Sequence, residues 1–399
     1  RTHNRSDDFC RMARGGLGAG DKAQRNWPLG GLALLLVLAV AWLGSLVGEP
    51  LLILARNTPQ LDGWSRVLAV GEPVQLVVAP TPGDADLTGA LYLPGQASTR
   101  GAIMLVNGTE VPLGWRDPAI QTFARSLASL GHAVYVPDLP GIKDERITPS
   151  ALSAVHADVA WFHTSGRAGR GTVALVGVCV GAALAMVAAE DPANHGIIGA
   201  VVGLDPYASL ADVLEAATTD HGLNAAGGLA PFAMAPWVKA VVVRMIAIAS
   251  LPDQGSRRLF EQALSNSPPN SPLQQFREQP PAGLSPAGLA WWRLLANRGP
   301  ANFQPLLERL PAASQAELAL LSPLTSAARL HVPVALMMPA LDFAFPAGEG
   351  PALKQANPAE VSTTTSSALD HVTPALTPSR LAGYWQLLRF AIRANQLLG

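Results

Sequence analysis

The sequence predicts an α/β fold, namely a doubly wound, mostly parallel sheet with an inserted helical cap and an N-terminal transmembrane helix. Three observations predict it. Short apolar runs alternate with helical patterns, which is the signature of parallel strands joined by crossover helices. The alternation is interrupted over residues 208–329, which contain helical patterns, and a charge-free apolar run occupies residues 28–48. The central apolar runs are continuous, as expected for strands that are covered on both faces.

The composition fits one large domain with appendages. The chain has 399 residues, of which 49% are hydrophobic and 14% are charged, so it can bury a large core. A net charge of −1 leaves no basic surplus to neutralise phosphates, and no nucleic-acid-binding motif is present. We therefore expect no nucleic-acid partner and no cofactor, while the oligomeric state stays open.

The charge-free run over residues 28–48 is a candidate membrane anchor. As a helix it would be roughly 30 Å long, about one hydrocarbon thickness. Basic residues are concentrated in residues 1–27, so the positive-inside rule makes this segment a cytoplasmic tail and places the remainder on the outer side of the membrane. A cleaved signal peptide, favoured by Ala39-Val40-Ala41, and a buried helix are the alternatives.

The chain has two cysteines, Cys10 in the basic tail and Cys179 deep in the chain. In the anchored topology they lie on opposite sides of the bilayer and cannot pair. Two cysteines also give no disulfide framework of the kind found in small secreted domains. We therefore expect both to be free thiols.

The core is expected to consist of residues 73–207 and 330–399, after a connector at residues 49–72. Its strands are predicted at residues 73–78, 89–93, 101–106, 133–136, 173–176, 198–204, 332–337 and 360–364. Its helices are predicted at residues 118–130, 149–164, 180–189 and 379–398.

Residues 208–329 are too many for a plain loop and predict an inserted helical cap. Its helical patterns lie at residues 211–218, 236–248, 257–265 and 289–296. The apolar stretch 231–250 carries Lys239 and Arg244, which makes a second membrane span costly. We expect a lid or core helix there, with an interfacial membrane helix as the alternative, and a packing role for Trp291 and Trp292.

The strongest local motif is Gly177-Val178-Cys179-Val180-Gly181, between an apolar strand and a helix. A nucleophile elbow needs small residues two positions before and after the nucleophile, because the sharp turn brings the backbones close together. Cys179 would then lie at a helix N-terminus, which favours the thiolate. The alternative is a buried cysteine that acts as a small hydrophobic residue.

An acid and a base follow the elbow in the order expected for this arrangement. Asp342 follows the strand at 332–337 and is the acid candidate, while His371 follows the last strand and is the base candidate. An imidazole accepts the thiol proton, and a carboxylate fixes its tautomer. Asp205, after the strand at 198–204, is the alternative acid, whereas Asp370 is expected to be a turn residue.

An oxyanion hole requires two converging backbone N–H donors. Val180, directly after the nucleophile, is expected to supply one of them. The loop after the third strand, which contains Asn107, Gly108 and Thr109, is expected to supply the other from Gly108 or Thr109. The remaining histidines show no metal-binding spacing, so we expect no metal site and structural roles for His132, His156, His163, His195, His221 and His331.

At these residues the chain resembles the α/β-hydrolase superfamily, and its Gly-x-Cys-x-Gly elbow is similar to that of the dienelactone hydrolase family. The resemblance covers residues 73–207 and 330–399. It implies hydrolysis of a small-molecule ester, lactone or thioester through a Cys-His-Asp triad and an acyl-enzyme. The chain departs from the family in its Asn107-Gly108 loop, its anchor and its long cap. Two alternatives remain: a non-catalytic protein that binds a ligand or partner, and an acyl transferase that acts on lipid.

Overall fold

The computed structural model describes residues 48–50, 74–95, 100–109, 111, 113–167, 169, 171–374 and 377–398. The described residues from Pro50 onward form one compact unit. The predicted tail, anchor and connector lie almost entirely outside the described residues. Within the part that is described, no helix combines the length and apolar character needed to cross a bilayer.

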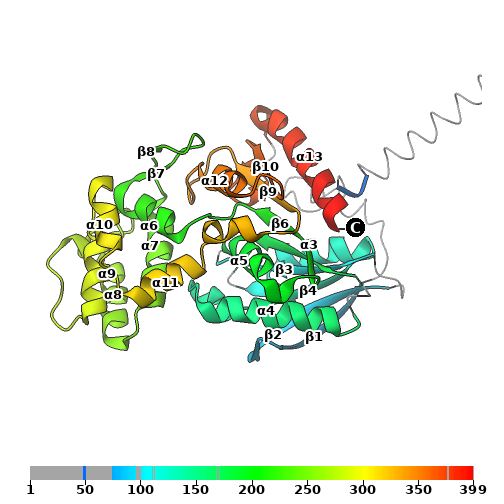
Figure 1. Cartoon of the computed structure of the whole chain (residues 1–399), viewed down its shortest axis with the longest axis horizontal. Helices are drawn as coiled ribbons and strands as arrows, with labels where there is room; N and C mark the ends of the chain where they lie inside the picture. Colours follow the sequence, from blue (N-terminus) through cyan, green and yellow to red (C-terminus); the bar gives the residue numbers. More distant parts are fainter. Residues whose placement is uncertain are drawn as a thin grey trace, which may run out of the picture. The chain divides into compact units, whose positions relative to one another are not determined.

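The unit is built on an eight-stranded sheet with the strand order β1-β2-β4-β3-β5-β6-β9-β10 (Figure 1). The contacts β1–β2 and β2–β4 are antiparallel and the other contacts are parallel. The strands are β1 (Val74–Thr81), β2 (Asp84–Pro94), β3 (Ala102–Val106), β4 (Ala133–Pro137), β5 (Val173–Val178), β6 (Ile198–Leu204), β9 (Val334–Pro339) and β10 (Val361–Ser366). All strands predicted for the core occur, β6 with the predicted bounds and the others with shifted ends, so the prediction of a mostly parallel α/β sheet is confirmed.

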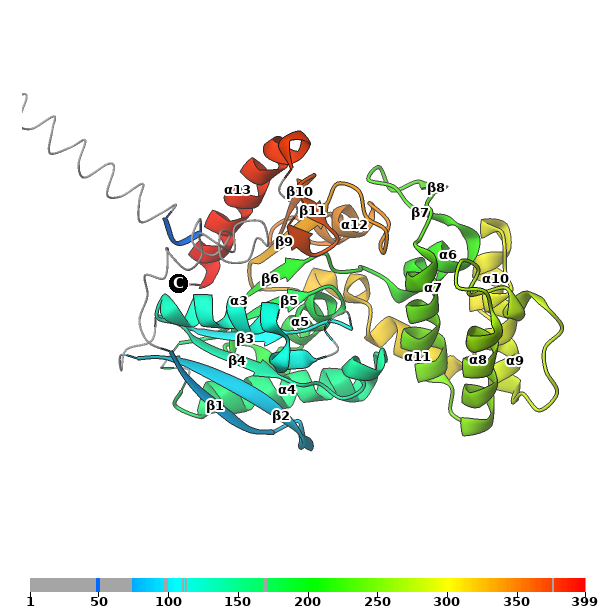
Figure 2. The same cartoon turned by 180° about the vertical axis from the view of Figure 1, so that it is seen from behind.

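Helices cover both faces of the sheet, as a doubly wound fold requires (Figures 1 and 2). Alternate residues of β3 point to opposite faces. Met104 and Val106 belong to one buried cluster with α4 (Pro149–Thr164) and α5 (Val180–Glu190). Ile103 and Leu105 belong to a second cluster with α3 (Pro118–Ser129) and α13 (Leu381–Leu398).

Only the central strands of the sheet have the continuous apolar sequence that the prediction described. Every residue of β3, β4 and β9 is buried. The edge strands β1 and β10 instead consist mostly of partly or fully exposed residues, and β10 has the polar sequence VSTTTS. An edge strand has a neighbour on one side only, so the continuous pattern is not required there.

The sequence predicts a helical insertion between β6 and β9, and the described residues there form helices, of which α8, α9 and α10 lie beside the sheet in both views (Figures 1 and 2). The predicted helix at 236–248 is an α-helix that continues into a π-helical turn. The short helices α10, α11 and α12 were not predicted. The elements after β6 are α6 (Leu210–Thr219), the hairpin β7 (His221–Leu223) and β8 (Leu229–Pro231), α7 (Pro236–Val242), the π-helix η5 (Val243–Ile248), α8 (Gln254–Asn266), α9 (Pro286–Leu295), α10 (Phe303–Leu307), α11 (Ala312–Leu320) and, after β9, α12 (Glu349–Ala356).

The insertion has an aromatic core of its own. Trp291 and Trp292 are buried, and Trp292 packs against Phe260 and Phe276 with ring centroids 5.5 and 4.7 Å away. Both tryptophans therefore have the packing role that the sequence predicted.

Candidate active site

Cys179 lies at the sharp turn between β5 and α5. Its backbone has φ 52° and ψ −121°, a left-handed conformation that is rare for residues other than glycine. A Cβ at Gly177 would lie 2.3 Å from Cα of Ala182, and one at Gly181 would lie 2.0 Å from the carbonyl oxygen of Val106. Only glycine fits at either position, so the turn has the geometry of a nucleophile elbow.

Two aspartates and a histidine follow the ends of β6, β9 and β10, at the same edge of the sheet as Cys179. Asp205 directly follows β6, and Asp342 lies in the loop after β9. His371 lies beyond β10, at the tip of a small hairpin formed by β11 (Leu369–Asp370) and β12 (Thr373–Pro374). Because β5, β6, β9 and β10 are neighbours in the sheet, these loops meet beside Cys179.

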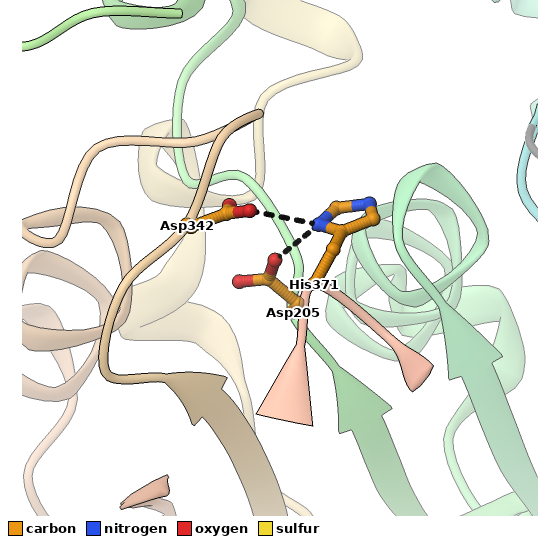
Figure 3. Close-up of side chains that lie close together, drawn as sticks. All are labelled: Asp205, Asp342 and His371. Carbon is orange, nitrogen blue, oxygen red and sulfur yellow. Dashed lines mark hydrogen bonds and ion pairs between the residues drawn. The ribbon is translucent and has the colours of Figure 1, made fainter. Parts of the chain in front are cut away.

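Both aspartates contact the same nitrogen of His371 (Figure 3). Nδ1 lies 2.6 Å from Oδ2 of Asp205 and 3.2 Å from Oδ1 of Asp342. Figure 3 shows the second ring nitrogen turned away from both carboxylates. The Cys179 thiol hydrogen-bonds with His371, and Nε2 is the nitrogen left for it. The sequence predicted one acid, whereas the structure brings both candidates to the imidazole.

Backbone strain is concentrated in this cluster. Among the described residues, five that are not glycine have positive φ, and three of them are Cys179, Asp205 and His371, at 52°, 49° and 52°. Such conformations cost free energy and gather at active sites, where the surrounding structure holds them. The strain is therefore independent evidence that this cluster is a functional site.

The electrostatics favour a charged imidazole. Burial lowers the pKa of His371, but the Cys179 thiol and the two aspartates raise it by more, so the net pKa lies well above the usual value. An imidazolium beside a thiol in turn stabilises the thiolate, which is the reactive form of cysteine.

The two carboxyl groups titrate in opposite directions. Complete burial raises the pKa of Asp205 well above its usual value, against the opposing effect of its bond to His371. Burial also raises the pKa of Asp342, but the hydrogen bond and charge of His371 outweigh it and the net pKa is lowered. Asp342 also accepts backbone hydrogen bonds from Ala344 at 3.1 Å and Phe345 at 2.6 Å, and the bond from Phe345 adds to the lowering. Two adjacent carboxylates cannot both ionise easily, so the opposite shifts make Asp342 the group that loses its proton first.

The predicted oxyanion-hole residues lie beside the elbow. Val180 is the first residue of α5, so its N–H has no partner within the helix. The absence of a side chain at Gly181 lets the elbow pack against the end of β3, directly before Gly108 and Thr109. Val180 and Thr109 both line the cavity that contains Cys179.

That cavity has a volume of about 240 Å³ and reaches from the thiol to the inserted helices. Sequence reasoning missed most of its walls, although the apolar stretch at 231–250 pointed to a lid. Its lining residues are Thr109, Lys143, Glu145, Cys179, Val180, Trp237, Val238, Val241, Val242, Met245, Ala344, Phe345 and His371.

The residues expected to be structural lie away from this chemistry. Asp370 turns outward and pairs with Arg380 at 2.7 Å. His156 hydrogen-bonds with Asn194 at 2.7 Å, and the rings of His195 and His331 pack with centroids 3.6 Å apart. The ligand atoms of Asp205, Asp342 and His371 are close enough to surround a metal ion, but their separations are those of charge-assisted hydrogen bonds.

No family model matches the chain, and no curated protein matches it either. Solved structures do match. Puromycin hydrolase is 14% identical with a TM-score of 0.47, over 82% of this chain and 39% of that one. A putative dienelactone hydrolase from Klebsiella pneumoniae is 11% identical with a TM-score of 0.42, over 80% and 99% of the two chains. An esterase from Pyrococcus furiosus is 12% identical with a TM-score of 0.43, over 82% and 92%.

The chain spans well under half of the length of puromycin hydrolase, and 42% of the length of the Pyrococcus horikoshii acylaminoacyl peptidase that it also matches. The assignment of the fold comes from the strand order and from the elbow itself. The fold is of the α/β-hydrolase type.

Proposed function

We propose that this protein hydrolyses carboxylic esters, including lactones and thioesters, with Cys179 as the nucleophile. One observation carries the proposal. Cys179 lies on a strained elbow, in hydrogen-bonding reach of a histidine whose other nitrogen contacts two carboxyl groups, and it opens into a cavity. Nucleophile, base and orienting acid are the three parts that covalent acyl transfer needs.

In the first half of the reaction, the Cys179 thiolate attacks the acyl carbon and forms a C–S bond while the carbonyl oxygen becomes an oxyanion. The N–H groups of Val180 and of Gly108 or Thr109 would stabilise that oxyanion. The intermediate collapses, the C–O bond breaks, and the leaving alcohol takes a proton from Nε2 of His371.

In the second half, Nε2 of His371 accepts a proton from water, and the resulting hydroxide attacks the thioester. The C–S bond breaks, the carboxylic acid leaves and the thiolate is restored. A thiolate is a good leaving group, so activated acyl groups suit this site better than amides do.

Asp205 and Asp342 would hold the imidazole in the required tautomer and stabilise the imidazolium. Asp342 is the charged partner, in agreement with its lowered pKa. Asp205 supplies the shorter contact to Nδ1, at 2.6 Å, as a protonated or proton-sharing neighbour.

The direct test is hydrolysis of a p-nitrophenyl ester by purified variants. Cys179→Ala should reduce turnover to background while the circular dichroism spectrum and the melting temperature are preserved, and Cys179→Ser should retain weak activity at most. Asp370→Asn, next to His371 but directed away from it, is the matched control and should retain full activity. Undiminished turnover by Cys179→Ala would end the proposal.

We also propose, from the sequence, that residues 28–48 anchor the protein in a membrane with the catalytic unit on the outer side. The charge-free run and the basic residues before it support this topology. The full-length protein should stay in the membrane fraction after carbonate washing. Release of a species that lacks about forty N-terminal residues would show a cleaved signal instead.

A further inference from the structure

One wall of the active-site cavity is a single stripe of apolar side chains on the inserted segment α7–η5. Val238, Val241, Val242 and Met245 all line the cavity. Their spacing of three, four and seven residues places them on one face of a helix. The lining also includes Ala344 and Phe345, which lie in the same loop as Asp342, so apolar side chains make up most of the cavity wall.

The stripe is fixed to the core beside the cavity. The backbone N–H of Ile147 donates to the carbonyl oxygen of Met245 at 3.1 Å. Arg244 forms an ion pair with Glu145 at 2.9 Å and another with Glu261 at 3.4 Å. These contacts join the π-helical turn to both the core and α8. This wall of the cavity therefore has a defined position.

From this geometry, and resting on the proposed function, we infer that the site selects an apolar acyl group of medium length that lies along the stripe. The acyl group is the part of the substrate that becomes bonded to Cys179, so a cavity that begins at the thiol suits it better than the departing alcohol. At roughly 30 Å³ for a group of about the size of water, the volume of about 240 Å³ accepts on the order of eight methylene-sized groups.

The expected signature is a chain-length profile. Burial of each further methylene should raise kcat/KM by about fourfold, from acetyl to octanoyl esters of p-nitrophenol, and the gain should stop once the cavity is full. Methyl octanoate should be preferred over octyl acetate, because only the former has the long chain on the acyl side. The reverse preference would place the alcohol in the cavity and overturn the inference.

Val241 is the position for the decisive variant, because it lines the cavity and is only partly buried. Val241→Phe should shorten the cavity and lower the octanoyl-to-acetyl ratio of kcat/KM at least tenfold, and Val241→Ala should move the optimum to longer chains. Gln262→Phe adds the same side chain at an exposed position of α8 and should leave the ratio unchanged. An unchanged ratio in Val241→Phe would refute the inference.

Binding separates this inference from the proposed function. The octanoyl ester should bind to Cys179→Ala protein in calorimetry with a negative heat-capacity change, and Val241→Phe in that background should weaken binding at least tenfold. If the wild type hydrolyses acetyl and octanoyl esters equally well through Cys179, the inference fails while the function stands. If Cys179→Ala retains full turnover, the function fails.

Discussion

The two ring nitrogens of His371 differ in the number of residues that contact them. On the thiol side, a single residue, Cys179, is held by one turn between β5 and α5. On the Nδ1 side, two strand ends, those of β6 and β9, each deliver an aspartate. No second residue can replace Cys179 on the thiol side, whereas two aspartates contact Nδ1 on the carboxylate side. Loss of one residue should therefore have different consequences on the two sides.

The largest effect should follow removal of the group that joins the two sides. His371→Gln removes the proposed base and the cation that would stabilise the thiolate, so kcat/KM on an activated ester should fall by about ten-thousandfold. Reaction of Cys179 with iodoacetamide at pH 6 should slow as well. A variant with near-normal turnover would show that the imidazole is not the base.

Removal of both aspartates should be almost as severe, and the single variants should be milder. Asp342→Asn removes the charged partner, but the pKa of Asp205 should then fall so that Asp205 carries the charge; we expect about a hundredfold loss. Asp205→Asn replaces a protonated acid by an isosteric amide and should cost about tenfold or less. Because each carboxyl group compensates for the other, the double variant should lose more than the product of the single losses.

Steady-state kinetics of the four-member cycle, with Asp370→Asn as the control, tests this redundancy. Strictly multiplicative losses would mean that the aspartates act independently. If Asp205→Asn is the crippled variant and Asp342→Asn is near normal, the charge belongs to the residue after β6.

The titration of His371 should show how its two neighbouring sets of residues affect its charge. The pKa of His371 is raised, so the stabilisation of its charged form is complete below the ordinary value near 6.5 and is lost only as the pH rises through the higher folded pKa. The resonances of His371 should therefore not titrate between pH 6 and 8 in nuclear magnetic resonance spectra. In the Asp205→Asn/Asp342→Asn variant a titration should return toward pH 6.5. Titration near 6.5 in the wild type would contradict the charged imidazole.

The smallest effect concerns Glu349 of α12, which is fully buried near the same sheet edge and makes no ion pair in the described part of the chain. Its Oε2 accepts from the backbone N–H of Ala208 and Ser209, just after Asp205. Burial raises the pKa of Glu349 to about 8. A raised carboxyl pKa means that the folded state binds more protons than the unfolded state between the two pKa values, so stability should fall as the pH rises from about 5 to 8, by on the order of 1 kcal/mol per pH unit. Glu349→Gln should flatten this dependence in thermal melts while activity is retained.

The strands, the elbow and the two aspartates differ in how far the sequence could predict them. The buried strands and the elbow depend on local signals: continuous apolar runs, and two glycines that a sharp turn requires. Asp342 and His371 could be placed by strand order. Recruitment of Asp205 as well could not be predicted, because it depends on the left-handed turn at Asp205, at φ 49°, and on the closeness of two loops.

The cap was predictable as an insertion but not as a cavity wall. The period of Val238, Val241, Val242 and Met245 is visible in the sequence, yet the same stripe would fit an ordinary core helix. Its role depends on the contacts that join η5 to Glu145 and Ile147, which link residues about one hundred positions apart. Helix α10 is only a turn or so long, and such short elements carry little periodic signal.

Trapping of the acyl-enzyme would show directly whether Cys179 is the nucleophile. The wild-type protein is mixed with excess p-nitrophenyl octanoate, quenched in acid within the first turnovers, digested and analysed by mass spectrometry. We expect an octanoyl thioester on the peptide that contains Cys179. Hydroxylamine should remove it, and it should be absent from the Cys179→Ala variant. Sustained ester hydrolysis with no adduct on Cys179, or with an adduct on another residue, would contradict it.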